Sequence, residues 1–191
     1  MLQIVLIRPG STDYHEQKLI QGTLDVPLNA DGNAEVRRLI EELGSLELDA
    51  IYASEGEPAV QTGAALSAAL DVKFRKLDRL HNLDHGLWQG MAIDEIRLRQ
   101  PKVYRQWQDA PECVCPPQGE TLEAADDRVR SAMAKILKRH KEGVVGLVVP
   151  EPLASLVRRY FTQKELGDLW QATQEHGGWE ILSLAPAEAS S

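Results

Sequence analysis

Leu2-Gln3-Ile4-Val5-Leu6-Ile7-Arg8-Pro9-Gly10 is the stretch of sequence that decides the fold. Its first six residues are almost all apolar, and the last three end the run with two strand breakers. This pattern predicts a buried strand followed by a loop. Further strands are predicted at 49–53, 72–74, 144–149 and 179–184.

Amphipathic segments alternate with these strands. Asn29 is a plausible N-cap for a helix that ends at Gly44, and a further helical stretch is interrupted at Pro101. The other helices are predicted at 59–70, 122–137 and 153–161. Apolar strands that alternate with helices indicate an α/β fold with a mostly parallel central sheet and helices on both faces. We expect a single domain over 1–184 and a frayed tail at 185–191.

The composition excludes several classes of protein. The 191 residues carry 29 acidic and 21 basic side chains, a net charge of −8, so a protein that binds nucleic-acid phosphates is not expected. The apolar runs are too short to span a membrane, and no signal peptide is visible. Two cysteines are too few for a disulfide framework, which favours a reducing, cytoplasmic setting.

The loops after the strands are the places to search for a site, because ligands of such folds bind beyond the carboxyl ends of parallel strands. Three exits carry prolines and charged residues: Arg8-Pro9-Gly10, Ser54-Glu55-Gly56-Glu57-Pro58 and Pro150-Glu151-Pro152.

An ordered series of motifs begins with Ile7-Arg8-Pro9-Gly10-Ser11-Thr12 and continues through Asp25-Val26-Pro27-Leu28 to Pro117-Gln118-Gly119-Glu120-Thr121. Between them lie similar matches at 21–22, 51–62 and 83–90. The series resembles the histidine phosphatase superfamily, the phosphoglycerate-mutase-like proteins, over about residues 2–183. The resemblance implies a three-layer sandwich and phosphoryl transfer through a phosphohistidine.

The residues that the resemblance assigns to catalysis are changed in this chain. Pro9 stands at the nucleophile, Pro58 at the second arginine, Asn82 at the acid and Glu151 at the second histidine. Loss of a covalent nucleophile costs a rate factor of about 10⁶. We therefore expect no catalytic residues and a pseudoenzyme with a binding, regulatory or assembly role.

Three residues are candidates for ligand binding: Arg8, which the resemblance retains, and Ser11 and Glu151. An unpaired arginine in a partly closed pocket is costly, so we expect Arg8 to pair with Glu151, whose carboxylate would stand in the place of phosphate.

Two alternatives remain open. One is an enzyme with repurposed acid–base chemistry that uses Glu151, Asp84 or His85, although Asp84 fits a structural hydrogen bonder and His85 a solvated loop residue. The other is a sensor that binds a small anion through Arg8.

No cofactor and no metal are expected. Glu57 and Glu151 lack histidine partners, and Cys113 and Cys115 fit a loop-packing role. Trp88 and Trp170 are expected in the core. The expected partner is an unknown protein or a small anionic ligand, with no nucleic acid or membrane, and the protein is expected to be a monomer or a homodimer.

Overall fold

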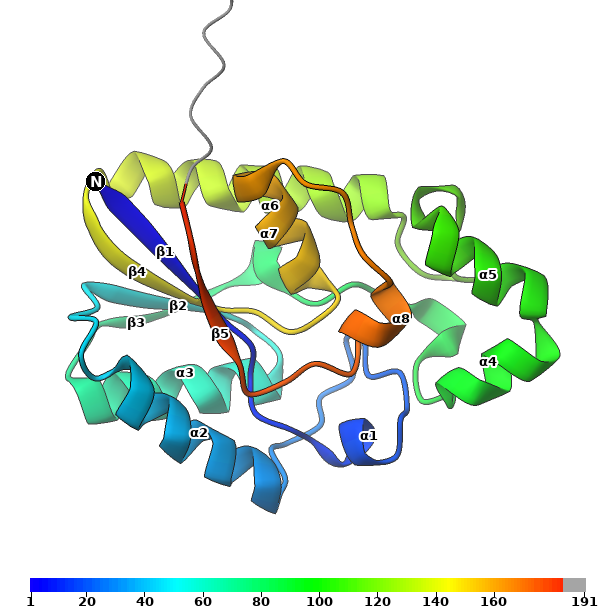
Figure 1. Cartoon of the computed structure of the whole chain (residues 1–191), viewed down its shortest axis with the longest axis horizontal. Coiled ribbons are helices and arrows are strands. Elements are labelled where there is room, and N and C mark those ends of the chain that lie inside the picture. Colours follow the sequence, from blue (N-terminus) through cyan, green and yellow to red (C-terminus); the bar gives the residue numbers. More distant parts are fainter. Residues whose placement is uncertain (184–191) are drawn as a thin grey trace, which may run out of the picture.

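The computed structural model describes residues 1–183, so residue 184 and the tail predicted at 185–191 lie outside the described residues. A five-stranded sheet in the order β3-β2-β4-β1-β5 forms the centre (Figure 1). β1 (Leu2–Ile7), β2 (Ala50–Ser54), β3 (Phe74–Leu77) and β4 (Gly143–Val148) are parallel. β5 (Trp179–Leu182) is antiparallel to β1. The predicted α/β class with a mostly parallel sheet is confirmed.

Helices cover both faces of the sheet, as predicted. α2 (Ala30–Leu43) and α3 (Glu57–Leu70) lie on one face, and α6 (Leu122–Arg139) and α7 (Leu153–Thr162) lie on the other (Figure 1). Alternate residues of β1 point to opposite faces: Val5 packs in the cluster with Leu39, and Leu6 packs in the cluster with Val129. Both clusters are fully buried, which makes this a three-layer fold.

The remaining helices are short. They are α1 (Asp13–Glu16), α4 (Ile93–Arg99), α5 (Pro101–Asp109), α8 (Leu169–Ala172) and the 3₁₀ turns η1 (Asp78–Leu80), η2 (Gly86–Trp88) and η3 (Pro111–Cys113). Pro101 begins α5, so the predicted interruption is confirmed. Within residues 1–183, no helix has the length and apolarity required to cross a membrane.

Local signals explain where the long helices begin. The Asn29 side chain accepts a hydrogen bond from the N–H of Gly32 (2.8 Å), and Thr121 caps α6 through the N–H of Ala124 (3.2 Å). The predicted cap at Asn29 is therefore confirmed. β3 begins at Phe74 and not at Val72, because it is a half-exposed edge strand whose Arg75 and Lys76 gave no apolar signal.

Candidate functional site

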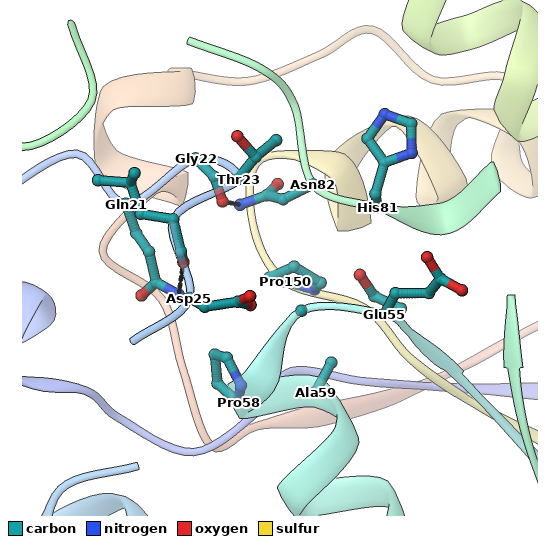
Figure 2. A pocket seen from close by; sticks show the side chains of 13 residues that line it. Gln21, Gly22, Thr23, Asp25, Glu55, Pro58, Ala59, His81, Asn82 and Pro150 are labelled. Atoms are coloured by element: carbon teal, nitrogen blue, oxygen red, sulfur yellow. Dashed lines mark hydrogen bonds between the residues drawn. The ribbon is translucent and has the colours of Figure 1, made fainter. Parts of the chain in front are cut away.

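A pocket of about 270 Å³ opens where β2 and β4 end. Its walls come from the loop 21–25, the turn from β2 into α3, residues 81–82 and Pro150 (Figure 2). Two of the three strand exits selected from the sequence therefore contribute to the pocket, whereas the exit at Arg8-Pro9-Gly10 does not line it.

The charged side chains that line this pocket are acidic. They are Asp25 and Glu55, and His81 is the titratable residue beside them. The lining set contains no lysine or arginine. Figure 2 shows the Asp25 carboxylate pointing across the pocket toward Pro150.

Asp25 also occupies the amino end of α3. Its Oδ1 accepts a hydrogen bond from the N–H of Glu57 (3.2 Å), the first residue of the helix. Helix N-termini attract anions through free N–H groups and the helix dipole. Here the protein's own carboxylate takes one of those donors, and Pro58 has no N–H to offer.

Arg8 lies outside the pocket in a cluster of carboxylates. Its Nε donates to Glu151 Oε1 (2.9 Å) and lies 3.1 Å from Glu175 Oε2, and its Nη2 donates to Glu180 Oε1 (3.0 Å). The Arg8 side chain is 7% exposed and that of Glu151 is 0% exposed. The predicted pairing of Arg8 with Glu151 is confirmed, and Glu175 and Glu180 add two partners that the sequence did not indicate.

Burial raises the pKa of Glu151 above its usual range, against the opposing effects of Arg8 and of the hydrogen bond from Ser155. The carboxyl group thus depends on these partners to remain charged.

Ser11 and Pro9 also lie away from the pocket lining. Ser11 is buried, and its N–H donates to Glu35 Oε2 (2.9 Å). The carbonyl of Pro9 accepts from the N–H of Gly177 (2.8 Å). Of the four changed positions, Pro58 and Asn82 line the pocket, and Pro9 and Glu151 do not.

Asn82 and Arg128 fix the segment that forms the upper wall of the pocket in Figure 2. The Asn82 amide donates to the carbonyls of Gly22 (3.2 Å) and Glu151 (3.0 Å). Arg128 donates to the carbonyl of His81 (2.7 Å). The pocket is therefore held by bonds between segments far apart in the sequence.

The structure corrects the prediction that His85 is a solvated loop residue. The ring is 1% exposed, against the expected solvated loop position, and it packs on Trp88 and Trp107 with centroid distances of 6.3 and 5.6 Å. Burial lowers the pKa of His85 to about 4. Asp84 accepts from the N–H of Gly86 (2.8 Å), as expected for a structural residue. Neither residue lines the pocket, so the structure does not bring them together with a ligand site.

Trp88 and Trp170 are buried, as predicted. Cys113 and Cys115 are exposed free thiols. Across residues 1–183 no group of three His, Cys, Asp or Glu side chains is arranged to hold a metal ion.

Sequence reasoning missed Asp25, Glu55 and His81 as pocket residues. Asp25 and Glu55 each carried a signal, since one lies in the Asp-x-Pro-Leu motif and the other in a strand exit. His81 carried no such signal in the sequence, because its position depends on the path of η1 and on the hydrogen bonds from Arg128.

Comparisons with known proteins identify the relatives of this chain. Residues 4–190 match the model of the histidine phosphatase superfamily (branch 1). Phosphoserine phosphatase 1 of Hydrogenobacter thermophilus is 30% identical over 148 residues, 78% of this chain and 70% of that protein. Probable phosphoglycerate mutase GpmB of Enterobacter sp. is 30% identical over 154 residues, 81% of this chain and 71% of that protein. The solved structure of Bacillus stearothermophilus YhfR superposes with a TM-score of 0.84 at 26% identity, covering 95% of this chain and 90% of that one.

These names contradict the prediction of a pseudoenzyme. The relatives are named as a phosphatase and a probable mutase, and nothing among them identifies a catalytically inactive protein. The prediction rested on four changed positions, and substitutions at assigned positions do not by themselves define what the remaining pocket does.

Proposed function

This chain belongs to the histidine phosphatase superfamily (branch 1), and we propose that its ligand site is the pocket at the ends of β2 and β4. We propose that this pocket binds a small organic amine. The observation that carries this proposal is the charge of the lining: Asp25 and Glu55 are carboxylates, and no lysine or arginine accompanies them. An ammonium group gains charge-assisted hydrogen bonds from such a lining, whereas a phosphate dianion is repelled.

Two of the groups that could bind an anion near the pocket already have internal partners, which supports the proposal. Arg8 contacts Glu151, Glu175 and Glu180. The first N–H of α3 donates to Asp25. A phosphate ester would have to displace these carboxylates before it could gain a comparable contact.

We also propose that the protein functions in the reducing cytoplasm and that it is a monomer or a homodimer.

Phosphomonoester hydrolysis is a second candidate, and the names of the relatives favour it. His81 is the histidine of the pocket lining, so hydrolysis by a histidine of this pocket would depend on it.

A thermal-shift titration with putrescine, ethanolamine, phosphoserine and inorganic phosphate tests the proposal. A saturating amine should raise the melting temperature by about 3 °C or more, and phosphate should not. Asp25→Asn keeps a capping oxygen for α3 and removes the charge, so it should weaken amine binding about 10-fold or more.

Glu41→Gln is the matched control, since Glu41 is an exposed residue of α2 and does not line the pocket. Amine binding equal in all three proteins, or no amine binding at all, would overturn the proposal. Hydrolysis of p-nitrophenyl phosphate that is lost in His81→Ala would instead establish the second candidate.

A further inference from the structure

Cys113 and Cys115 are the two cysteines of the chain, and both are exposed as free thiols. Val114 lies between them, is 8% exposed and packs in the core cluster that contains Trp107. Of these three consecutive residues, Val114 is therefore the one that packs the loop, and the two cysteines present their thiols to solvent.

The backbone at Val114 sets the separation of the two cysteines. Its φ of −119° and ψ of 131° are those of an extended chain. Alternate residues of an extended segment share a side, so the burial of Val114 leaves Cys113 and Cys115 together on the solvent side. Two residues of extended chain span about 6.6 Å between Cα atoms. A disulfide usually joins Cα atoms about 4.4–6.8 Å apart, so this pair lies near the upper limit for a direct bond between the sulfurs.

Hydrogen bonds and prolines fix this geometry. The N–H groups of Cys113 and Val114 donate to the carbonyls of Ala110 (3.0 Å) and Pro111 (3.1 Å). Pro111 and Pro116 flank the segment and are buried, and each ring fixes its own φ. The two thiols are thus held near each other before any ligand binds, which lowers the entropic cost of bringing them to one ligand.

The thiol of Cys115 has two weak hydrogen bonds. Its sulfur donates to the carbonyls of Pro116 (3.6 Å) and Gly119 (3.7 Å). Because the side chain is exposed, a rotation about χ1 breaks these bonds and frees the sulfur for another partner.

Two neighbouring thiols suit a soft cation that needs few ligands. Thiolates favour soft ions such as Cu(I), which is stable between two sulfurs in a near-linear arrangement. Thiolate–metal bonds of about 2.3 Å, the value for zinc, span about 4.6 Å between two sulfurs. This longer bridge suits cysteines that stand far apart for a disulfide. Within residues 1–183 no group of three His, Cys, Asp or Glu side chains could hold a metal, but a two-coordinate ion needs only a pair.

We propose that Cys113 and Cys115 chelate one Cu(I) ion. Each thiol releases its proton to solvent as its sulfur binds, so one ion displaces two protons and the bis(thiolate) complex carries a single negative charge. Neither cysteine lines the pocket at the ends of β2 and β4, so this proposal stands independently of the proposed function.

Anaerobic competition with the Cu(I) chelator bathocuproine disulfonate, in a reductant that is not a thiol, tests the proposal. The wild-type protein should take up one Cu(I) per chain. Cys113→Ser and Cys115→Ser each keep one exposed thiol, and each should bind Cu(I) at least about 100-fold more weakly, because the second thiolate of a chelate acts at a high effective concentration. Without metal, both variants should melt at the wild-type temperature, since the replaced side chains are exposed.

Two further measurements identify the coordination. In weakly buffered solution, the wild-type protein should release two protons for each Cu(I) bound. Zn(II) should bind at least about 100-fold more weakly than Cu(I), because structural zinc sites use four ligands and this pair supplies half of them.

Equal Cu(I) uptake by the wild-type protein and both serine variants would show adventitious binding by separate thiols and would overturn the proposal. Absence of uptake by the wild-type protein would overturn it as well. Zn(II) binding as tight as that of Cu(I) would contradict a two-coordinate site. Sedimentation that shows a dimer only when Cu(I) is present would assign the ligands to two chains and would contradict chelation within one.

Discussion

The side-chain amide of Asn82 bonds to the carbonyl of Gly22 at 3.2 Å and joins two walls of the pocket that lie 60 residues apart in the chain. The same nitrogen donates to the carbonyl of Glu151 (3.0 Å), and the Asn82 oxygen accepts from the N–H of Leu83 (2.9 Å). One buried side chain thus connects the loop 21–25, the segment after η1 and the exit of β4.

Asn82→Ala should lower the free energy of unfolding by about 2 kcal/mol, because it leaves buried backbone groups without partners. Urea denaturation measures the change. Asn82→Asp should not restore stability, since it retains the acceptor but loses both donated bonds. A loss below about 0.5 kcal/mol for the alanine variant would show that these bonds do not hold the pocket walls.

Gly22→Ala should distort the pocket. Gly22 has φ +53°, and a Cβ at this position would overlap the side chain of Gln89, which itself accepts from the N–H of Thr23 (2.8 Å). We expect a loss of about 1 kcal/mol or more from the left-handed backbone, together with weaker amine binding. Gly56→Ala is the control within the same pocket, because no atom lies within 4 Å of its Cβ position. Equal effects of the two substitutions would contradict the expectation.

Arg128→Met should destabilise the fold by about 3 kcal/mol. Arg128 and Glu120 form a pair with side chains 12% and 14% exposed, and Arg128 also donates to three carbonyls at 79, 81 and 82. Burial opposes the ionisation of Glu120, but the hydrogen bond and charge of Arg128 outweigh it and lower the pKa of that carboxyl.

Arg130→Met is the matched control on the same helix. Its side chain is 60% exposed, so its pair with Asp126 should contribute less than about 1 kcal/mol. Chemical denaturation of both variants at pH 7 compares the two losses, and similar values would refute the prediction.

Acidification should destabilise the protein through His85. Its pKa of about 4 in the fold lies below the ordinary 6.5, so the unfolded chain binds the proton more strongly. The stability from neutral His85 is complete above pH 6.5 and decreases as the pH falls toward 4, by at most about 3 kcal/mol. Burial likewise lowers the pKa of His15 to about 4, which acts in the same direction.

Unfolding free energies at pH 7.5 and 5.5 measure this dependence. His85→Phe should reduce the difference between the two pH values and leave the part due to His15. The raised pKa of Glu151 acts in the opposite sense at pH values above 4.5, so the contribution of His85 is taken from the difference between wild type and His85→Phe and not from the total pH dependence. A pH dependence that is unchanged in His85→Phe would assign the effect to other groups.

The sequence predicted those features that depend on local pattern. The apolar runs located β1 and β4, and their parallel register places Ile7 beside Val148, which brings the exits with Arg8 and Glu151 together. The sequence did not predict that Glu175 and Glu180 contact Arg8, because β5 returns antiparallel to β1 and no local signal specifies that return. The burial of His85 was missed for a similar reason. Asp84, His85 and Gly86 read as a polar turn, and the covering Trp107 belongs to a helix about twenty residues later.

The position of β1 in the sheet has a consequence for synthesis of the protein. β1 is translated before the other strands of the sheet, yet it lies between β4 and β5, whose residues follow it by about 140 and 175 positions. Its hydrogen-bonding edges therefore remain unpaired on the ribosome until nearly the whole described chain has been translated. Contacts of such long sequence separation form slowly, and an unpaired apolar strand is prone to aggregate. We therefore expect protection of this six-residue strand, until residues 179–182 emerge, to raise the yield of folded protein.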